Sequence, residues 1–348
     1  MTDTPMAGSD LRTTLARLPK VELHRHLEGS LRLGTLCEIA REYALDVPTE
    51  PAQLRPLVQM MVYDEPSSAN FLSKFMTLRK FYRSPEIIRR LAFEVIEDAA
   101  RDNVSYLELR FTPMALAKSN GYSLRDVSHW MLMAVADARR AFPQLHVELI
   151  ASINRHEAVE IAEEVTQIAV DHKEDIVGLD LAGDEANFSA EPFAPLFREA
   201  RRAGLGITVH AGEWTGAENV RHAIERLEAD RIGHGVRVVE DANVVALARE
   251  RGTVFEVCVT SNWQSGVISR LSDHPLPAML AHGLRVTLNT DDPAVEDVTL
   301  TDEYETAIIA LGITPAQIKT TIRTAAQAAF LPPNEKQKLI QYLERLLV

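Results

Sequence analysis

Two histidines separated by one residue, His24 and His26, are the first residues whose types and spacing could do chemistry. They lie near the end of a short apolar run, Val21–Glu28, that has the composition of a β-strand. Because side chains in a strand alternate between its two faces, both imidazoles would project from the same face. Two neutral imidazoles directed at one point make half of a binding site for a divalent metal ion.

Residues that could supply the other half follow later apolar runs. These candidates are His210, Glu213, His234, Asp291 and Asp292. Three imidazoles and one carboxylate would hold an ion such as zinc and leave room for a water molecule; the four ligands in this prediction are His24, His26, His210 and Asp291. Such an ion lowers the pKa of its water to about 7 and so supplies hydroxide at neutral pH.

The remaining candidates would handle protons and water. Glu213 is placed to give a proton to a substrate, and His234 and Asp292 could orient or deprotonate the attacking water. Asp180 and Glu256 are candidates for fixing the tautomers of the ligand histidines through hydrogen bonds. Together these residues predict the metal-assisted hydrolysis of an electrophilic carbon.

Eight short runs rich in Val, Ile and Leu recur along the chain, which is typical of buried parallel strands. The runs are Val21–Glu28, Ser105–Pro113, Leu145–Ile153, Ile176–Gly183, Gly206–Glu213, Arg231–Val236, Thr253–Asn262 and Arg285–Asp292. Amphipathic helical stretches precede the later runs: Glu86–Asn103, Ser123–Ala141, Glu157–His172, Pro192–Ala203, Ala217–Ala229, Asp241–Arg251 and Pro275–Gly283. Eight such units favour a closed (β/α)₈ TIM barrel of the α/β class, whose active site lies at the carboxyl ends of the strands.

Two segments interrupt the alternation. About 75 residues separate the first two runs, more than one crossover needs, and part of Leu54–Phe75 is expected to cover the pocket. The segment Thr314–Val348 predicts two further helices on the outside of the barrel. No low-complexity linker divides the chain, so we expect one domain over residues 1–348.

The composition narrows the class of protein. Of the 348 residues, 46% are hydrophobic and 25% charged, and the formal net charge is −13, which argues against a nucleic-acid or anionic-lipid surface. Cys37 and Cys258 form no CxxC pair, which fits a reducing compartment. There is no signal-peptide pattern and no apolar run of membrane-spanning length. We therefore expect a cytoplasmic protein that acts on a small molecule.

Five sequence blocks carry a resemblance to a known family. HRHLEGSL, DLAGDE, HAGE, RIGHG and NTDDP look like the signature blocks of the adenosine deaminase family within the amidohydrolase superfamily, in family order. They span Leu18 to about Tyr304 and are specific as a set. The resemblance implies a barrel with one Zn²⁺ per chain that hydrolyses the 6-amino group of adenosine or 2′-deoxyadenosine and releases ammonia.

Carried over by position, the resemblance also implies roles at the purine. Glu213 would protonate N1 and make C6 electrophilic, His234 would position and activate the hydroxide, and Asp292 would hold the hydroxide or N7. The backbone N–H of Gly183 would donate to N3. Glu28 would face the ribose, where many family members carry Asp, so this departure leaves the sugar contact open. The substrate contacts implied in this way are His26, Glu28, Gly183 and Asp292.

Several alternatives stay open at this point. Other 6-aminopurines, namely aminodeoxyfutalosine or free adenine, would suit the same blocks, and a non-catalytic metal-binding barrel is the alternative outside enzymes. A binuclear site usually needs a lysine on the fourth strand, and Ile176–Gly183 contains none. The unrelated cytidine-type deaminases need a PCxxC motif that is absent. Iron or cobalt would fit the same ligands as zinc, and the sequence predicts no oligomeric state.

Overall fold

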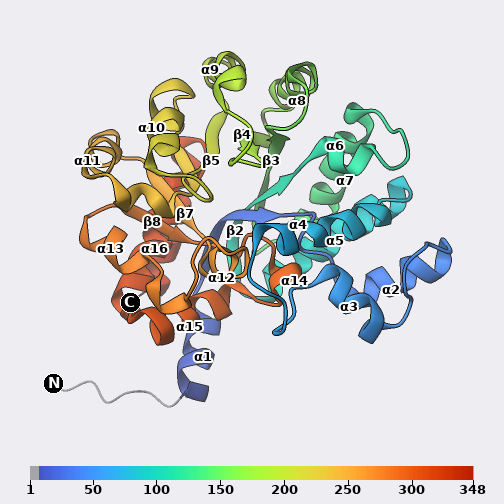
Figure 1. Cartoon of the computed structure of the whole chain (residues 1–348), viewed down its shortest axis with the longest axis horizontal. Coiled ribbons are helices and arrows are strands. Elements are labelled where there is room, and N and C mark those ends of the chain that lie inside the picture. Colours follow the sequence, from blue (N-terminus) through green and yellow to red (C-terminus); the bar gives the residue numbers. More distant parts are fainter. Residues whose placement is uncertain (1–7, 348) are drawn as a thin grey trace.

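The computed structural model describes residues 8–347, and its strands form one eight-stranded parallel sheet in sequence order. The strands are β1 (Lys20–His26), β2 (Val104–Phe111), β3 (His146–Asn154), β4 (Ile176–Ala182), β5 (Gly206–Ala211), β6 (Arg231–His234), β7 (Val254–Val257) and β8 (Arg285–Leu288). Each pairs with the next, and the helices surround them (Figure 1). The prediction of a (β/α)₈ barrel is confirmed.

The ring closes where β8 meets β1, at a seam made by few residues. An isolated parallel bridge joins Arg25 to Asp291. The backbone N–H of Asp291 donates to the carbonyl of His24 (3.0 Å), and that of His26 donates to the carbonyl of Asp291 (2.8 Å). Three of the predicted metal ligands therefore lie at this seam.

The helices of the repeating units match the predicted stretches to within a few residues. They are α5 (Pro85–Arg101), α7 (Leu124–Ala141), α8 (Val159–Asp171), α9 (Ala194–Arg202), α10 (Ala217–Arg226), α11 (Ala242–Arg251) and α13 (Leu276–Ala281). Serine caps explain part of the shift: the side chain of Ser123 accepts from the N–H of Asp126, so α7 starts one residue later than predicted.

The seventh run is the clearest difference from the prediction. Thr253–Asn262 was expected to be one strand, but β7 ends at Val257 and a short helix, α12 (Val259–Gln264), follows. The buried carboxylate of Glu303 accepts from the N–H groups of Val259 and Thr260 and so satisfies the start of this helix. The turn brings the residues after β7 towards the carboxyl end of the barrel.

The segments outside the repeat are helical. The insertion after β1 holds α2 (Leu33–Glu42), α3 (Pro51–Val58), α4 (Ser68–Leu78) and the 3₁₀ turn η1 (Arg79–Phe81), and the two predicted C-terminal helices are α16 (Pro315–Ala328) and α17 (Pro333–Leu346). Elements that the sequence did not reveal include α1 (Gly8–Arg17), α6 (Pro113–Ala117), α14 (Pro293–Glu296), α15 (Leu300–Leu311) and the 3₁₀ turns η2 (Glu191–Phe193), η3 (Val236–Glu240) and η4 (Leu271–Asp273). Helix α16 packs on β8 and β1 and so covers the seam.

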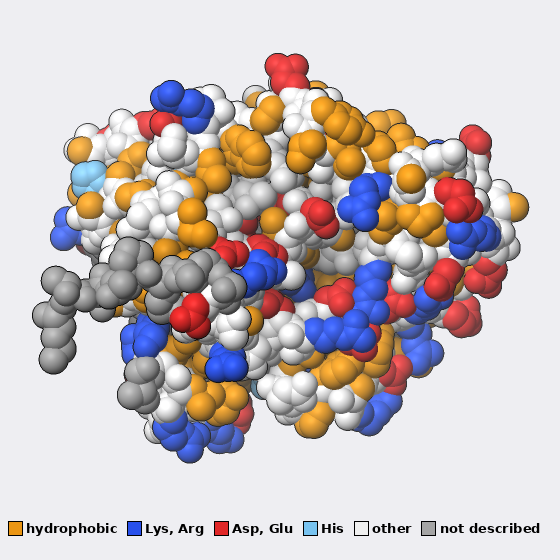
Figure 2. Space-filling view, turned by 90° about the horizontal axis from the view of Figure 1, so that it is seen from below, with side chains coloured by type: hydrophobic (Ala, Val, Ile, Leu, Met, Phe, Trp, Pro, Cys, Tyr) orange, Lys and Arg blue, Asp and Glu red, His pale blue; other side chains and the backbone are white. Residues whose placement is uncertain are grey.

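The exterior carries charges of both signs. On the face shown in Figure 2, Lys and Arg side chains are interspersed with Asp and Glu. Within residues 8–347, no helix combines the length and the apolar character needed to cross a bilayer.

Charged side chains also fill the inside of the barrel, where they pair with one another. Arg110 forms ion pairs with Asp180 (3.2 Å) and Glu256, and Arg231 pairs with Glu108 and Glu256 (2.6 Å to the latter). All five side chains are buried. Removing one partner from such a network leaves a buried charge uncompensated, at a cost of about 3–5 kcal/mol. The network lies directly beneath the predicted metal ligands.

Candidate metal centre and active site

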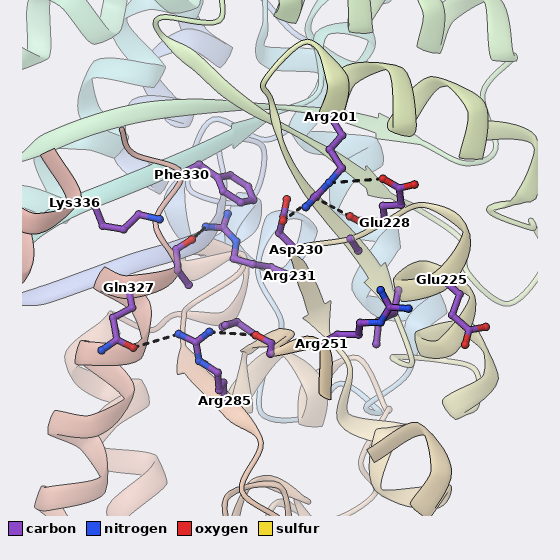
Figure 3. A pocket seen from close by; sticks show the side chains of 15 residues that line it. Arg201, Glu225, Glu228, Asp230, Arg231, Arg251, Arg285, Gln327, Phe330 and Lys336 are labelled. Atoms are coloured by element: carbon purple, nitrogen blue, oxygen red, sulfur yellow. Dashed lines mark hydrogen bonds and ion pairs between the residues drawn. The ribbon is translucent and has the colours of Figure 1, made fainter. Parts of the chain in front are cut away.

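Two of the cavities formed by residues 8–347 are considered as the functional site. The larger, of about 860 Å³, lies at the amino-terminal ends of β6 and β8 (Figure 3). Two of its arginines have structural partners: Arg231 donates to the carbonyl of Ala328 at the end of α16, and Arg285 donates to that of Gly252 at the end of α11. Such contacts satisfy helix carboxyl ends, which is a structural role for these two side chains.

The smaller cavity, of about 260 Å³, lies at the carboxyl ends of the strands, where barrel enzymes place their chemistry. The predicted site residues that line it are His26, Glu28, Gly183, His210, Glu213, His234, Asp291 and Asp292. Phe71 and Phe75 of α4 form part of its wall, whereas Met61 does not line it. We therefore build the site here.

The structure brings the four predicted metal ligands together. One ligand atom from each of His24, His26, His210 and Asp291 lies within 4.8 Å of the others. The two Nε2 atoms of His24 and His26 are 3.3 Å apart, and Asp291 Oδ1 is 3.2 and 3.4 Å from them. Tetrahedral bonds of 2.0–2.1 Å place ligand atoms about 3.3–3.4 Å apart. The spacing of this donor set fits a zinc-sized ion.

Carboxylates behind two of the histidines orient them. His24 Nδ1 lies 3.0 Å from Glu256 Oε2, and His210 Nδ1 lies 2.9 Å from Asp180 Oδ1. Because a carboxylate accepts, each Nδ1 carries the proton and each Nε2 presents a lone pair to the shared point. Asp180 and Glu256 therefore sit where the sequence placed them, as tautomer-fixing partners.

The remaining ligands are also prepared to bind a cation. Burial lowers the pKa of His26 to about 3, against the opposing charge of Asp291, so its imidazole is neutral at pH 7. Ser261 donates to Asp291 Oδ2 (2.7 Å) and leaves Oδ1 facing the histidines. Two other possible donor groups, which add Cys258 or Glu296, share Asp291 but offer fewer imidazoles.

Glu213 lies beside the ligands as a buried acid. It is only 4% exposed, and its Oε1 is 3.7 Å from His234 Nε2. Burial raises the pKa of Glu213 well above its usual range, and the charges of Asp291 and Glu185 raise it further. A raised pKa favours the acid form of the carboxyl group, which suits a proton donor.

Glu185 is a buried residue that the sequence analysis missed. Its carboxylate accepts from the backbone N–H groups of Gly212 (2.6 Å), Glu213 (3.0 Å) and Trp214 (2.9 Å). It thereby fixes the loop that carries the proton donor. Its only signal in the sequence was its place as the last residue of DLAGDE, since hydrogen bonds to a distant backbone leave no local pattern.

Two site residues hold unusual backbone conformations. His234 and Asp291 have φ angles of 58° and 69°, in the left-handed region that side chains rarely adopt. Such strain persists only where the surrounding structure enforces it, and it occurs often at functional sites. His234 is the last residue of β6, and Asp291 lies three residues after the end of β8, so both stand where the chain leaves a short strand.

Asp292 follows Asp291 and is buried with Oδ1 lacking any partner among the described residues. Burial, together with the charges of Asp291 and Glu28, raises the pKa of Asp292 well above its usual range. It occupies the position before α14, but its side chain makes no capping hydrogen bond. Asp292 is among the residues that line the cavity, and its Oδ1 keeps an unused capacity to accept a hydrogen bond.

We expect a single methyl group at Gly29 to disturb Asp292. A Cβ at Gly29 would lie 1.8 Å from Asp292 Oδ1, so Gly29→Ala must push that carboxylate aside. A displacement of about 1 Å at a reacting centre costs about 10²-fold in rate, which steady-state kinetics on 6-aminopurines will measure. Gly34→Ala is the matched control, because no atom lies within 4 Å of its added Cβ. Equal activities of the two variants would contradict this expectation.

The two remaining predicted contacts lie on the cavity wall. Glu28 Oε1 accepts from the N–H of Thr112 (2.7 Å), while Oε2 is buried without a partner. Burial raises the pKa of Glu28 to about 7. Gly183 has a φ of +89°, and a Cβ there would come within 3.1 Å of His156 Nδ1. A side chain at this position would be strained and would narrow the cavity.

Comparison with known proteins adds independent information. Residues 19–346 match the family model described as adenosine deaminase. An adenosine deaminase of Erwinia tasmaniensis is 40% identical over 92% of this chain and 96% of that protein; one of Klebsiella pneumoniae is 39% identical over 93% and 97%.

Solved structures at 27% identity share the fold. An adenine deaminase of Arthrobacter aurescens has a TM-score of 0.86 over 94% of this chain and 98% of its own. A zinc-bound amidohydrolase of Burkholderia ambifaria has a TM-score of 0.86 over 99% and 95%. The Arabidopsis protein ADAL complexed with IMP has a TM-score of 0.83 over 95% and 98%.

Proposed function

This chain belongs to the adenosine deaminase family of hydrolases, and from that premise we propose that it converts adenosine or 2′-deoxyadenosine to inosine or 2′-deoxyinosine and ammonia. One observation carries the proposal: a metal-capable donor set and a buried carboxyl group with a raised pKa, Glu213, face the same cavity. A water nucleophile and a proton donor on one ring are what hydrolytic deamination needs.

We propose one Zn²⁺ per chain, held by the donor set of His24, His26, His210 and Asp291. The spacing of the ligand atoms supports this choice, as does the zinc bound in the Burkholderia relative. Zinc held there lowers the pKa of a water molecule to about 7 and so supplies a nucleophile at neutral pH.

The chain's own residues then handle the purine. Glu213 gives its proton to N1, which makes C6 electrophilic, and the water oxygen adds to C6. The two protons of the water go to the amino nitrogen and to the carboxylate of Glu213, the bond from C6 to the amino nitrogen breaks, and ammonia leaves. The free oxygen of Asp292 accepts a hydrogen bond from the water or from a protonated N7. The Gly183 N–H donates to N3, and His26 and Glu28 complete the substrate contacts.

A substrate panel tests the proposal. Metal-loaded protein is given adenosine, 2′-deoxyadenosine, adenine and aminodeoxyfutalosine at equal concentrations, and ammonia release is measured. We expect the two nucleosides to be the best substrates. A dominant rate on adenine or aminodeoxyfutalosine would reassign the substrate, and no ammonia from any of them would favour a non-catalytic metal-binding barrel. Further expectations are a single domain over residues 1–348, a cytoplasmic location and a small-molecule substrate, with neither nucleic acid nor membrane as a partner.

Glu28 offers a sharper test of the sugar contact. Glu28→Gln keeps an acceptor for the Thr112 N–H but replaces the unpartnered oxygen with an amide donor. Losing one hydrogen bond to a ribose hydroxyl costs about 1–2 kcal/mol, so KM for nucleosides should rise about 5–30-fold. Adenine, which has no sugar, is the control substrate and should show an unchanged KM. An equal rise for both substrates would place Glu28 elsewhere than at the sugar.

A further inference from the structure

A chain of three hydrogen bonds connects a backbone N–H to the candidate catalytic His234. We propose that His274 is a positioning residue that acts through Asn262 to hold His234 in the tautomer with its proton on Nε2. The proposal rests on the proposed function only where it assigns His234 a part in the deamination. All three side chains are buried within the part of the chain that the structure describes.

The first bond fixes the proton of His274. The backbone N–H of Leu276 lies 3.1 Å from His274 Nδ1, and a backbone N–H can only donate. Nδ1 must therefore be the unprotonated nitrogen of a neutral ring, and Nε2 carries the proton. The ring is neutral at pH 7, because burial lowers the pKa of His274 to about 3.

The second and third hydrogen bonds have their donors and acceptors fixed by the first, as far as His234. His274 Nε2 lies 3.2 Å from the side-chain oxygen of Asn262, which must accept. The amide nitrogen of Asn262 then lies 3.1 Å from His234 Nδ1 and donates to it. Turning the amide over would set its N–H₂ against the N–H of His274, so only one orientation satisfies every group.

The consequence is that His234 offers the cavity a donor. Its Nδ1 lone pair is used by Asn262, so the proton lies on Nε2, which is 3.7 Å from both Glu213 Oε1 and Asp291 Oδ2. A ring in this state cannot take a proton from the attacking water at Nε2. It can orient the water oxygen and stabilise charge that develops there. This chain of hydrogen bonds, from Leu276 through His274 and Asn262 to His234, is called the relay below. It leaves His234 able to orient the attacking water but unable to deprotonate it.

A structural role for His274 must be separated from this one. Helix α13 starts at Leu276, so His274 also satisfies an N–H in the first turn of that helix. A substitution at His274 could act through the helix alone. The test therefore changes Asn262 as well, and it reads the tautomer directly.

Asn262→Asp, which keeps the size of the side chain, tests whether residue 262 donates the hydrogen bond to His234. A carboxylate can only accept, so His234 should move its proton to Nδ1 and present a lone pair at Nε2. Nitrogen-15 NMR of histidine-labelled protein reports the protonated nitrogen with zinc bound and without it; His234→Gln assigns the signal. We expect the wild type to carry the proton on Nε2, the variant to carry it on Nδ1, and kcat to fall by about 10²–10⁴-fold, the range seen when a catalytic histidine is held in the wrong tautomer.

His274→Asn tests the start of the relay. Asparagine can still cap α13 but is too short to reach Asn262, so thermal stability should hold while His234 shows a mixture of tautomers and kcat falls about tenfold. His282→Asn, at the exposed far end of α13, is the matched control and should change neither. A wild-type proton on Nδ1, or a tautomer unchanged in both relay variants, would overturn the proposal. The NMR measurement needs no turnover. It therefore tests the tautomer of His234 even if the proposed substrate is wrong.

Discussion

Replacing Glu213 by glutamine should leave the metal ion bound and lower kcat by about 10²–10⁴-fold, the usual contribution of a general acid. Glutamine keeps the size of the side chain but has no acidic proton for N1. Metal content and kcat on adenosine, measured on the same preparation, check this expectation. Glu157→Gln, a loop carboxylate after β3 that does not line the cavity, is a suitable control. Loss of metal together with activity would place Glu213 among the ligands instead.

The same residue predicts a pH dependence. Because the pKa of Glu213 is raised by burial and by neighbouring carboxylates, its acid form persists to a higher pH than that of an ordinary glutamate. The proton to be donated is lost only as pH rises through that raised value, so kcat should decline on the alkaline side. The Glu213→Gln variant should lack this decline, and its persistence in the variant would assign it to another group.

Removing the metal should have the other large effect. Dialysis against a chelator should reduce activity by several orders of magnitude, because water without a metal ion has a pKa near 15.7 instead of about 7. Adding one equivalent of Zn²⁺ per chain should restore it. Elemental analysis and titration of the metal-free protein measure both quantities.

Substitution of a metal-binding residue tests the metal requirement without a chelator. His210→Ala removes one imidazole from the donor set, together with its hydrogen bond to Asp180 Oδ1, so zinc content and activity should fall together. His146→Ala, a surface histidine at the start of β3, is the control and should retain both. A requirement for two ions per chain would contradict the single site.

The sequence was informative where local pattern and chemistry coincide. Strand runs end in residues such as His210 and Asp291, so the periodic pattern located both the barrel and the edge where its chemistry lies. The ends of elements were less predictable. Apolar residues after Val257 continue the strand pattern, but a helix begins there instead, and the distant carboxylate of Glu303 accepts hydrogen bonds from its first N–H groups.

Long-range partners were beyond the reach of local pattern. In the sequence, Arg110 and Ser261 are ordinary residues of two predicted strand runs. In the structure, Arg110 contacts Asp180, which orients a metal ligand, and Ser261 contacts the ligand Asp291 itself. His274 is a lone histidine before a proline, with no spacing that links it to His234. Such contacts depend on which side chains the closed barrel brings together, which one sequence does not display.

The position of the seam also has a consequence for how the protein becomes active. His24 and His26 are among the first residues of the barrel to leave the ribosome, whereas Asp291 follows the last strand. A complete donor set therefore exists only after synthesis has passed β8 and the ring has closed. Chains that end before β8 carry the histidines but lack Asp291, so a complete metal site and deaminase activity are expected only late in synthesis, once the barrel is finished.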